Sequence, residues 1–364
     1  MKNSIFSRRE FLKLAAVGVG AVGLQPWRRG VQLPEFPVYE RLGRVLQMTN
    51  IKARPNEDSA TVGVLYDDAV VPWLREAAGQ EPFNKVWGLF ARRWVETPDG
   101  YLYAPYVQPV RYLPNQPVDH LIPSSIGEGM WAEVTVPYTD VTLDGSPSSN
   151  SWVGIRTEQG LPVRLYYGQV FWVDQIRTQD AGQVYYRVNP NYYGGLDKLW
   201  APAEAFRPIL PDELAPISPE VEDKRVVVNL LKQTLSCFEG NTEVFYCRVS
   251  TGVFDEYTPV GAHKISRKFV ALQMSGGGSG GTGAGYDLPG IGWVSIFVTG
   301  GVAVHATVWH NGFGTRLSHG CVNTRPEDAK WIFRWTAPAV PYDPGMLDVT
   351  LTGEPSTVVQ VVAT

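Results

Sequence analysis

The sequence predicts a mainly β protein built from several domains. Short apolar runs are separated by turn signals along most of the chain, such as the Pro-Asp-Gly at 98–100. The 364 residues include 37 glycines and 28 prolines, and 44% are hydrophobic against 19% charged. This length allows two or three domains with their own cores, and the composition is not that of a disordered chain. The formal net charge of −4 gives no basic footprint for nucleic acid.

Residues 1–30 are predicted to be an export signal. Residues 7–13 read Ser-Arg-Arg-Glu-Phe-Leu-Lys, which resembles the twin-arginine consensus, and an uncharged run from Leu14 to Leu24 follows. That run is too short to span a bilayer as a permanent helix. No clean cleavage motif precedes Arg28, so the segment is either removed or kept as an anchor. We expect twin-arginine export to the cell wall or another extracytoplasmic location in the cell envelope.

Two β-rich segments, 43–110 and 129–210, are expected between the signal and the C-terminal part. Residues 54–63 and 100–103 of the first resemble bacterial SH3-like modules, which implies a small β-barrel. Such modules often bind cell walls, and a barrel that serves only as a spacer is the alternative. The second segment has similar length and turn density and is predicted to be a second SH3-like unit, without a residue-level repeat. Four prolines within 208–219 predict a semi-rigid linker.

The stretch 301–323 gathers three of the five histidines around one cysteine, Cys321. A strand-like run ends at His305, and Ser-His-Gly-Cys follows a Gly/Asn-rich turn. A helix is predicted over 324–335, with Thr324 and Glu327 as a capping box. A thiol of pKa about 8.5 needs a neighbouring imidazole or a helix N-terminus to become a nucleophile at neutral pH. The glycine before the cysteine lets consecutive backbone N–H groups point at an oxyanion.

The pattern H-x(12)-S-H-G-C-V-N resembles the catalytic core of the L,D-transpeptidase (YkuD-type) family. Matching residues upstream are Thr258-Pro-Val-Gly261, Lys268 and the run 286–293, and downstream the run 326–331. The resemblance covers 224–352. It implies a mixed β-sandwich catalytic domain with a short helix after the cysteine. It also implies a cysteine acyltransferase that acts on peptidoglycan and needs no metal or organic cofactor.

The resemblance makes Cys321 the nucleophile and His305 the general base, with the second ring nitrogen of His305 oriented by the carbonyl group of Ala306. Cys321 would attack the third residue of a tetrapeptide stem, release D-alanine and pass the thioester to the side-chain amine of another stem. The product is a 3→3 cross-link, and transfer to water would be a carboxypeptidase side activity. The expected partners are peptidoglycan stems as donor and acceptor, and carbapenem-type β-lactams as covalent inhibitors.

Further positions also follow from the resemblance. Ser318 and His319 shape the site, and the N–H groups of His319, Gly320 and Cys321 form the oxyanion hole. Asn323 stands where many family members carry arginine, which would change how a stem carboxylate is held. His310 has no assigned role. The expected substrate-binding residues are Trp309, Asn323 and Tyr286.

The remaining signals are weaker. A hairpin turn at 239–242 places Cys237 and Cys247 on opposite faces of the hairpin, so no disulfide is expected. The glycine-rich run 275–285 lacks the G-K-[ST] ending of a phosphate loop and is predicted to be a flexible loop over the site. His263 has no motif partner and is expected to be an ordinary loop or surface histidine.

Three other functions fit parts of the pattern. An NlpC-like wall peptidase would have to pair Cys237 with His305, because that family places its cysteine before its histidine. A zinc hydrolase would use His305, His310 and His319, but H-E-x-x-H is missing. An inactive wall-binding protein would not need the complete motif. The reactivity of the thiols separates these alternatives from the main hypothesis.

Overall fold

The computed structural model describes residues 31–80, 92–125, 127–146, 152–180, 182–189, 197–254, 257–276 and 286–363. The chain divides into two compact units, Met1–Gln32 and Leu33–Thr364. The predicted export signal at 1–30 lies outside the described residues, as does the glycine-rich run over 277–285. Within the described parts, no helix is long and apolar enough to cross a membrane.

The first β region forms two antiparallel sheets. One has the order β4-β1-β8 and the other β3-β2-β7-β6-β5. Their shared core includes Val45, Trp73 and Leu102. No closed barrel is found among the described residues, so the SH3-like barrel stays a prediction for this region. The strands and the short 3-10 helix are β1 (Leu42–Val45), β2 (Thr49–Lys52), β3 (Thr61–Leu65), β4 (Val70–Pro72), β5 (Arg75–Ala78), β6 (Arg93–Thr97), β7 (Gly100–Tyr103), η1 (Ala104–Tyr106) and β8 (Val107–Val110).

The second β region is built on a seven-stranded sheet of order β12-β16-β15-β14-β10-β17, with β9 paired to β10. A separate pair joins β11 to β13. Here too no closed barrel is found among the described residues. The elements are β9 (Ile122–Ser124), β10 (Gly127–Val134), β11 (Tyr138–Asp140), β12 (Thr142–Leu143), α2 (Trp152–Glu158), β13 (Arg164–Tyr166), β14 (Val170–Thr178), β15 (Val184–Asn189), β16 (Leu199–Pro202), η2 (Ala203–Ala205), β17 (Phe206–Pro208) and η3 (Pro211–Leu214).

Helix α2 is an element that the sequence pattern did not reveal, because the run 152–156 has the apolar character of a strand. The backbone N–H of Trp152 donates to Asp287 Oδ2 at 3.0 Å, and Thr157 bonds back to the carbonyl oxygen of Val153 at 2.7 Å. The first contact joins residues 135 positions apart. A helix start that depends on a partner this distant cannot be predicted from local sequence.

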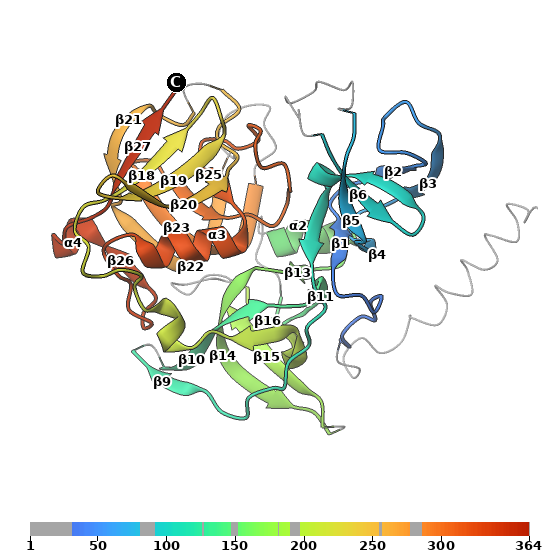
Figure 1. Cartoon of the computed structure of the whole chain (residues 1–364). Helices are drawn as coiled ribbons and strands as arrows, with labels where there is room; N and C mark the ends of the chain where they lie inside the picture. Colours follow the sequence, from blue (N-terminus) through green and yellow to red (C-terminus); the bar gives the residue numbers. More distant parts are fainter. Residues whose placement is uncertain are drawn as a thin grey trace, which may run out of the picture. The chain divides into compact units, whose positions relative to one another are not determined.

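The C-terminal region is a mixed sandwich of two five-stranded sheets (Figure 1). The first has the order β20-β19-β18-β27-β21, with β18 and β27 parallel. The second has the order β25-β24-β23-β22-β26, with β24 and β25 parallel. The elements are β18 (Lys224–Asn229), β19 (Thr234–Glu239), β20 (Thr242–Arg248), β21 (Gly261–Lys264), β22 (Arg267–Gly276), β23 (Tyr286–Val298), β24 (Val302–Ala306), β25 (Val322–Thr324), α3 (Pro326–Trp335), β26 (Met346–Asp348), α4 (Val349–Thr352) and β27 (Val358–Val362).

Helix α3 begins after Arg325 and contacts β23 and β24. Its buried Ile332 and Trp335 join the core between the two sheets, while Phe333 packs against Trp293 with ring centroids 5.5 Å apart. The predicted capping box is wrong, because the N-cap is Arg325 and it makes no side-chain capping bond. The hydroxyl of Thr324 instead donates to the carbonyl oxygen of His305 at 3.1 Å.

Cys237 and Cys247 are both free and buried in the same core cluster. The turn between Glu239 and Thr242 is where the sequence predicted it, but a bulge between Cys237 and Phe238 shifts the register by one residue. Cys247 therefore pairs with Leu235 and not with residue 234. The prediction that the thiols lie on opposite faces is wrong, because one bulge reverses the side to which every later residue points.

The two front β regions pack closely on the C-terminal region. The indole of Trp131 donates to the carbonyl oxygen of Tyr342 at 2.9 Å, and Glu213 in the predicted linker accepts from Lys330 at 2.5 Å. Leu214 of the same stretch is 5% exposed. The stretch 208–219 is thus part of the packed structure.

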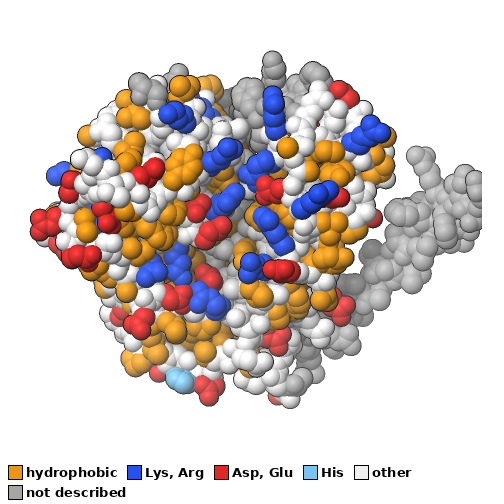
Figure 2. Space-filling view, viewed as in Figure 1, with side chains coloured by type: hydrophobic (Ala, Val, Ile, Leu, Met, Phe, Trp, Pro, Cys, Tyr) orange, Lys and Arg blue, Asp and Glu red, His pale blue; other side chains and the backbone are white. Residues whose placement is uncertain are grey.

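Lys and Arg side chains gather along the middle of the face seen in Figure 2, with Asp and Glu side chains among them.

Lys268 is fully buried at the end of α3, and its replacement by methionine is expected to lower the free energy of unfolding by about 3 kcal/mol. Its Nζ donates to the carbonyl oxygens of Phe333, Thr336 and Pro338 at 2.7–2.8 Å. Burial lowers the pKa of Lys268 to about 7. The three carbonyl oxygens oppose this shift, because they accept the three hydrogen bonds that the charged ammonium group can donate. Denaturant unfolding measures the loss. Lys264→Met, at an exposed position of β21, is the control, and an equal effect would contradict a special role for Lys268.

Candidate active site

The candidate nucleophile and base lie at neighbouring positions of two parallel strands. His305 is on β24, where it is paired with Asn323 of β25, and Cys321 immediately precedes β25. Cys321 is half-buried in an apolar cluster with Leu288, Ile291 and Trp309, and its Sγ lies 3.7 Å from the carbonyl oxygen of Gly301. The parallel pairing places the strand of His305 beside the strand that follows Cys321, although the two residues are sixteen positions apart in the sequence.

The side chain of His305 is buried and held by the main chain. Its Nδ1 lies 2.8 Å from the carbonyl oxygen of Ala306, as predicted. The carbonyl oxygen can only accept, so Nδ1 carries the proton and Nε2 is left free to accept one. Burial lowers the pKa of His305 to about 4, although the bond to Ala306 opposes this shift. The imidazole is therefore neutral at pH 7, which is the state a general base requires.

The thiol of Cys321 is not placed at a helix start, contrary to the prediction. Strand β25 and Arg325 separate it from α3. Burial raises the pKa of the Cys321 thiol, and a bond from the backbone N–H of Ala303 only partly offsets this. The resting site thus holds a neutral thiol, which donates to the carbonyl oxygen of Gly301, and a neutral imidazole on the neighbouring strand. The thiolate has to form by proton transfer to a base during the reaction.

Gly320 is needed for the turn that presents Cys321. Its φ is +134°, and a Cβ built on it would lie 2.6 Å from the carbonyl oxygen of Tyr257. The hydroxyl of Thr258 donates to the carbonyl oxygen of Gly320 at 2.7 Å and fixes the peptide from the other side. The predicted role of this glycine as a tight turn agrees with this geometry.

The predicted oxyanion donors are not all free in the structure. The backbone N–H of Gly320 donates to Ser318 Oγ at 3.0 Å, and that hydroxyl donates to the carbonyl oxygen of Cys321 at 2.6 Å. Ser318 therefore braces the loop around the nucleophile. His319 is exposed, whereas His305 and Asn323 are buried.

Trp309 and Asn323 surround the histidines. The ring of Trp309 lies 5.9 Å from that of His305, centroid to centroid. Asn323 is buried, and its amide nitrogen lies 2.9 Å from Nε2 of His310. Burial lowers the pKa of His310 to about 3, and the nearby His305 adds to this shift. The third predicted substrate position, Tyr286, begins β23, but its side chain lies outside the described residues.

The first β region holds the loop that carries Trp309, which sequence analysis did not foresee. Arg44 is buried and donates to the carbonyl oxygen of Val308 at 2.8 Å. Asn311 donates its amide to the carbonyl oxygens of Ala104 and Val107 at 3.2 and 3.0 Å. These pairs join residues more than 200 positions apart, so no local signal could have indicated them.

Residues 223–360 match the model of YkuD, the L,D-transpeptidase catalytic domain. No curated protein matches the chain. This segment therefore carries a YkuD-type L,D-transpeptidase catalytic domain. It includes β27, which lies beyond the predicted end at 352 and pairs with β18 and β21.

Similar solved structures include L,D-transpeptidases from three bacteria. A mutant of the Enterococcus faecium enzyme is 21% identical over 40% of this chain and 51% of its own, with a TM-score of 0.30. The Stackebrandtia nassauensis enzyme is 24% identical over 42% and 60%, with a TM-score of 0.28. The Mycobacterium smegmatis enzyme is 16% identical over 80% and 99%, with a TM-score of 0.30. The chain spans about half the length of the first structures that it matches.

Iodoacetamide is expected to modify Cys321 before the other two cysteines, at a rate that keeps rising with pH into the alkaline range. Burial raises the pKa of the Cys321 thiol, so the thiolate fraction still grows at alkaline pH. Cys237 and Cys247 are buried, and burial raises the pKa of both thiols. Peptide mapping between pH 6 and pH 10 measures the order. A rate that levels off below pH 7 would show a thiolate–imidazolium pair, and earlier labelling of Cys237 would contradict the site assignment.

Proposed function

We propose that this protein is a cysteine acyltransferase that forms 3→3 cross-links between peptidoglycan stem peptides. One observation carries the proposal. His305 of the YkuD-type segment is held through Nδ1 by the carbonyl group of Ala306. It lies on β24, and the neighbouring strand β25 begins directly after Cys321. A histidine held through Nδ1 keeps Nε2 free to accept a proton, and a thiol whose pKa is raised by burial needs such an acceptor.

In the proposed reaction, Cys321 Sγ bonds to the carbonyl carbon of the third stem residue while its proton passes to His305 Nε2. The bond to the terminal D-alanine then breaks, and the amine of D-alanine leaves with that proton. The thioester is next attacked by the side-chain amine of an acceptor stem, which restores the thiol. Attack by water instead gives a tripeptide, which is the carboxypeptidase side activity. Among the predicted oxyanion donors, we assign the main stabilising role to the N–H of Cys321 itself.

The test is incubation of the purified protein with a defined tetrapeptide muropeptide, followed by mass spectrometry. The expected products are D-alanine and a dimer linked through third residues, and neither should form with Cys321→Ala. Dimers absent at every acceptor concentration, with tripeptides still formed, would make the protein a carboxypeptidase. Hydrolysis of another peptide bond, persisting in Cys321→Ala, would favour one of the alternative hydrolases. A carbapenem is expected to add covalently at Cys321 and at neither of the other cysteines.

We further propose that the protein is exported by the twin-arginine route and acts in the cell envelope, with the front β regions of SH3-like type near the wall. The paired arginines at positions 8 and 9 are the supporting feature. Arg8→Lys combined with Arg9→Lys is expected to leave the precursor in the cytoplasm, because a receptor recognises the pair. Fractionation of cells that express each form measures this. Normal export of the double mutant would contradict the proposal.

A further inference from the structure

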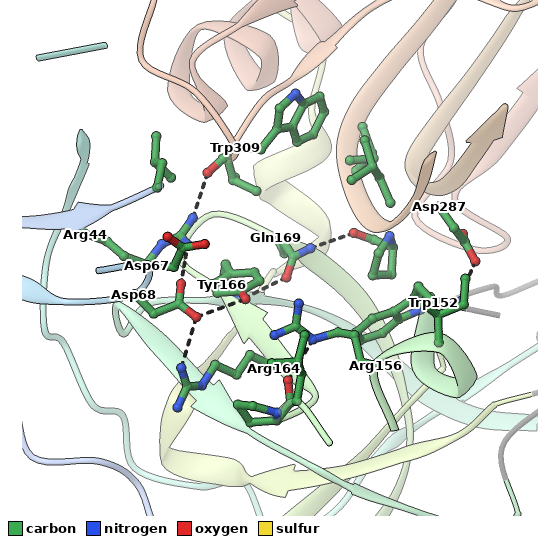
Figure 3. Close-up of a pocket in the computed structure, with 18 of the residues that line it drawn as sticks. Arg44, Asp67, Asp68, Trp152, Arg156, Arg164, Tyr166, Gln169, Asp287 and Trp309 are labelled. Carbon is green, nitrogen blue, oxygen red and sulfur yellow. Dashed lines mark hydrogen bonds and ion pairs between the residues drawn. The ribbon is translucent and has the colours of Figure 1, made fainter. Parts of the chain in front are cut away.

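A cavity of about 1010 Å³ lies where the two front β regions meet the catalytic domain (Figure 3). We call it the junction cavity; its walls come from β1 and the turn before β4, from α2 and β13, and from β23 and the loop after β24. Leu288, Ile291 and Trp309 line it and also belong to the apolar cluster that contains Cys321. The junction cavity therefore shares an apolar wall with the cluster that contains the reacting thiol.

Three guanidinium groups line the junction cavity, and two of them are occupied. Arg44 donates to Asp68, to the side chain of Gln108 and to the carbonyl oxygen of Val308, at 2.8–3.0 Å. Arg164 donates to Asp68 at 3.0 Å and to Asp140 at 2.7 Å. The two oxygens of Asp68 are thus shared between Arg44 and Arg164. Arg44 and Arg164 therefore already have carboxylate partners within the protein.

Arg156, the third, is different. Its Nε donates to the carbonyl oxygen of Pro162 at 2.7 Å, which fixes the plane of the guanidinium group. In the parts of the chain that the structure describes, its two terminal nitrogens form no hydrogen bond or ion pair. The side chain extends from α2 towards Tyr166 (Figure 3). Burial raises the pKa of Tyr166 to about 12, and Arg156 is one of the positive charges that oppose this.

Three carboxylates line the junction cavity, those of Asp67, Asp68 and Asp287, and none of them pairs with Arg156 in the part of the chain that the structure describes. Asp287 accepts from the backbone of Trp152 and from Gln273, and Asp68 is taken up by the two other arginines. A guanidinium group with two free N–H edges suits a carboxylate, which it can bind through two parallel hydrogen bonds. Peptidoglycan stems carry carboxylates besides the one that leaves with D-alanine. Asn323 in the catalytic motif is buried against His310 and is not available for such a group.

We propose that the junction cavity holds a stem peptide and that Arg156 pairs there with one of its free carboxylates. The proposal rests on the proposed function and adds the binding group and its location. Arg156 belongs to the second β region, and under this proposal it determines which stem peptides the neighbouring catalytic domain accepts. Either the donor or the acceptor stem can supply the carboxylate, and the experiment distinguishes the two.

The experiment compares wild-type protein and Arg156→Gln with free-acid stems and with stems whose carboxylates are amidated one at a time, first in the donor and then in the acceptor. For the wild type, one amidation is expected to raise KM by about 10- to 100-fold, because a charged hydrogen-bonded pair is lost. Arg156→Gln should show the same rise with the free acid and no further rise with that amide. Arg156→Lys should lie between them, because it keeps the charge without the fork.

Binding provides a readout that does not depend on turnover. Calorimetry with Cys321→Ala should show tighter binding of the free acid than of the amide, and this preference should vanish in Cys321→Ala with Arg156→Gln. Arg54→Gln, an exposed arginine of the first β region, is the matched control and should retain the preference. Absence of D-alanine release from every donor would refute the proposed function. Full activity on all amidated stems, or unchanged discrimination in Arg156→Gln, would refute this inference alone.

Discussion

Replacing His305 by alanine is expected to lower the rate of D-alanine release by about 10²–10⁴-fold, the usual contribution of a general base. The reason is the raised pKa of the Cys321 thiol, which leaves little thiolate without a neighbouring acceptor. Because the pKa of His305 is lowered to about 4, the neutral base is present above that pH. Turnover in the wild type should therefore be lost as the pH falls through about 4. Release of D-alanine and the rate of alkylation are measured on both proteins.

His319 and His263 supply the comparison for that experiment. The side chain of His319 is exposed, so His319→Ala should reduce turnover less and leave thiol alkylation closer to the wild-type rate. His263 lies half-buried on β21, with its Nε2 2.9 Å from the carbonyl oxygen of Pro259, and among the described residues it forms no hydrogen bond with His305 or Cys321, so His263→Ala should be neutral in both assays. Equal losses for His305→Ala and His319→Ala in both readouts would show that the two roles have been confused.

Features of the site that depend on neighbouring residues were predictable from sequence. The bond from His305 to Ala306 joins adjacent residues, and the positive φ of Gly320 follows from a glycine placed before the cysteine. The predicted hairpin turn before β20 was also correct. In each case the interaction closes within a few residues, so the local sequence contains both partners.

Features that depend on distant contacts were missed. The start of α2 is fixed by Asp287, and the hold of Arg44 on the carbonyl group of Val308 spans 264 positions. The thiol environment was misjudged because burial, which raises the pKa of Cys321, is a property of the packed sandwich. The sequence predicts the front β regions as modules on a linker, whereas in the structure Arg44 and Asn311 form hydrogen bonds between the first β region and the C-terminal domain.

The second large effect is expected for Gly320→Ala, which should lower turnover by at least about 10²-fold. The new Cβ would lie 2.6 Å from the carbonyl oxygen of Tyr257, and ordinary contact begins at 3.4 Å, so the backbone has to move by roughly 0.8 Å. A shift of about 1 Å in a reacting group can cost about 10²-fold in rate. The conformation itself, with φ of +134°, adds strain of about 1–3 kcal/mol for any residue with a side chain.

Gly145→Ala is the matched control, because Gly145 has a φ of +112° and nothing within 4 Å of its added Cβ. It carries similar backbone strain without the clash and lies outside the catalytic domain. Both variants should lose some thermal stability, and only Gly320→Ala should also lose D-alanine release and slow the alkylation of Cys321. If Gly320→Ala and Gly145→Ala have the same turnover, the contact with Tyr257 does not set the position of the nucleophile. The loop would then owe its geometry to the bonds of Ser318 and Thr258 alone.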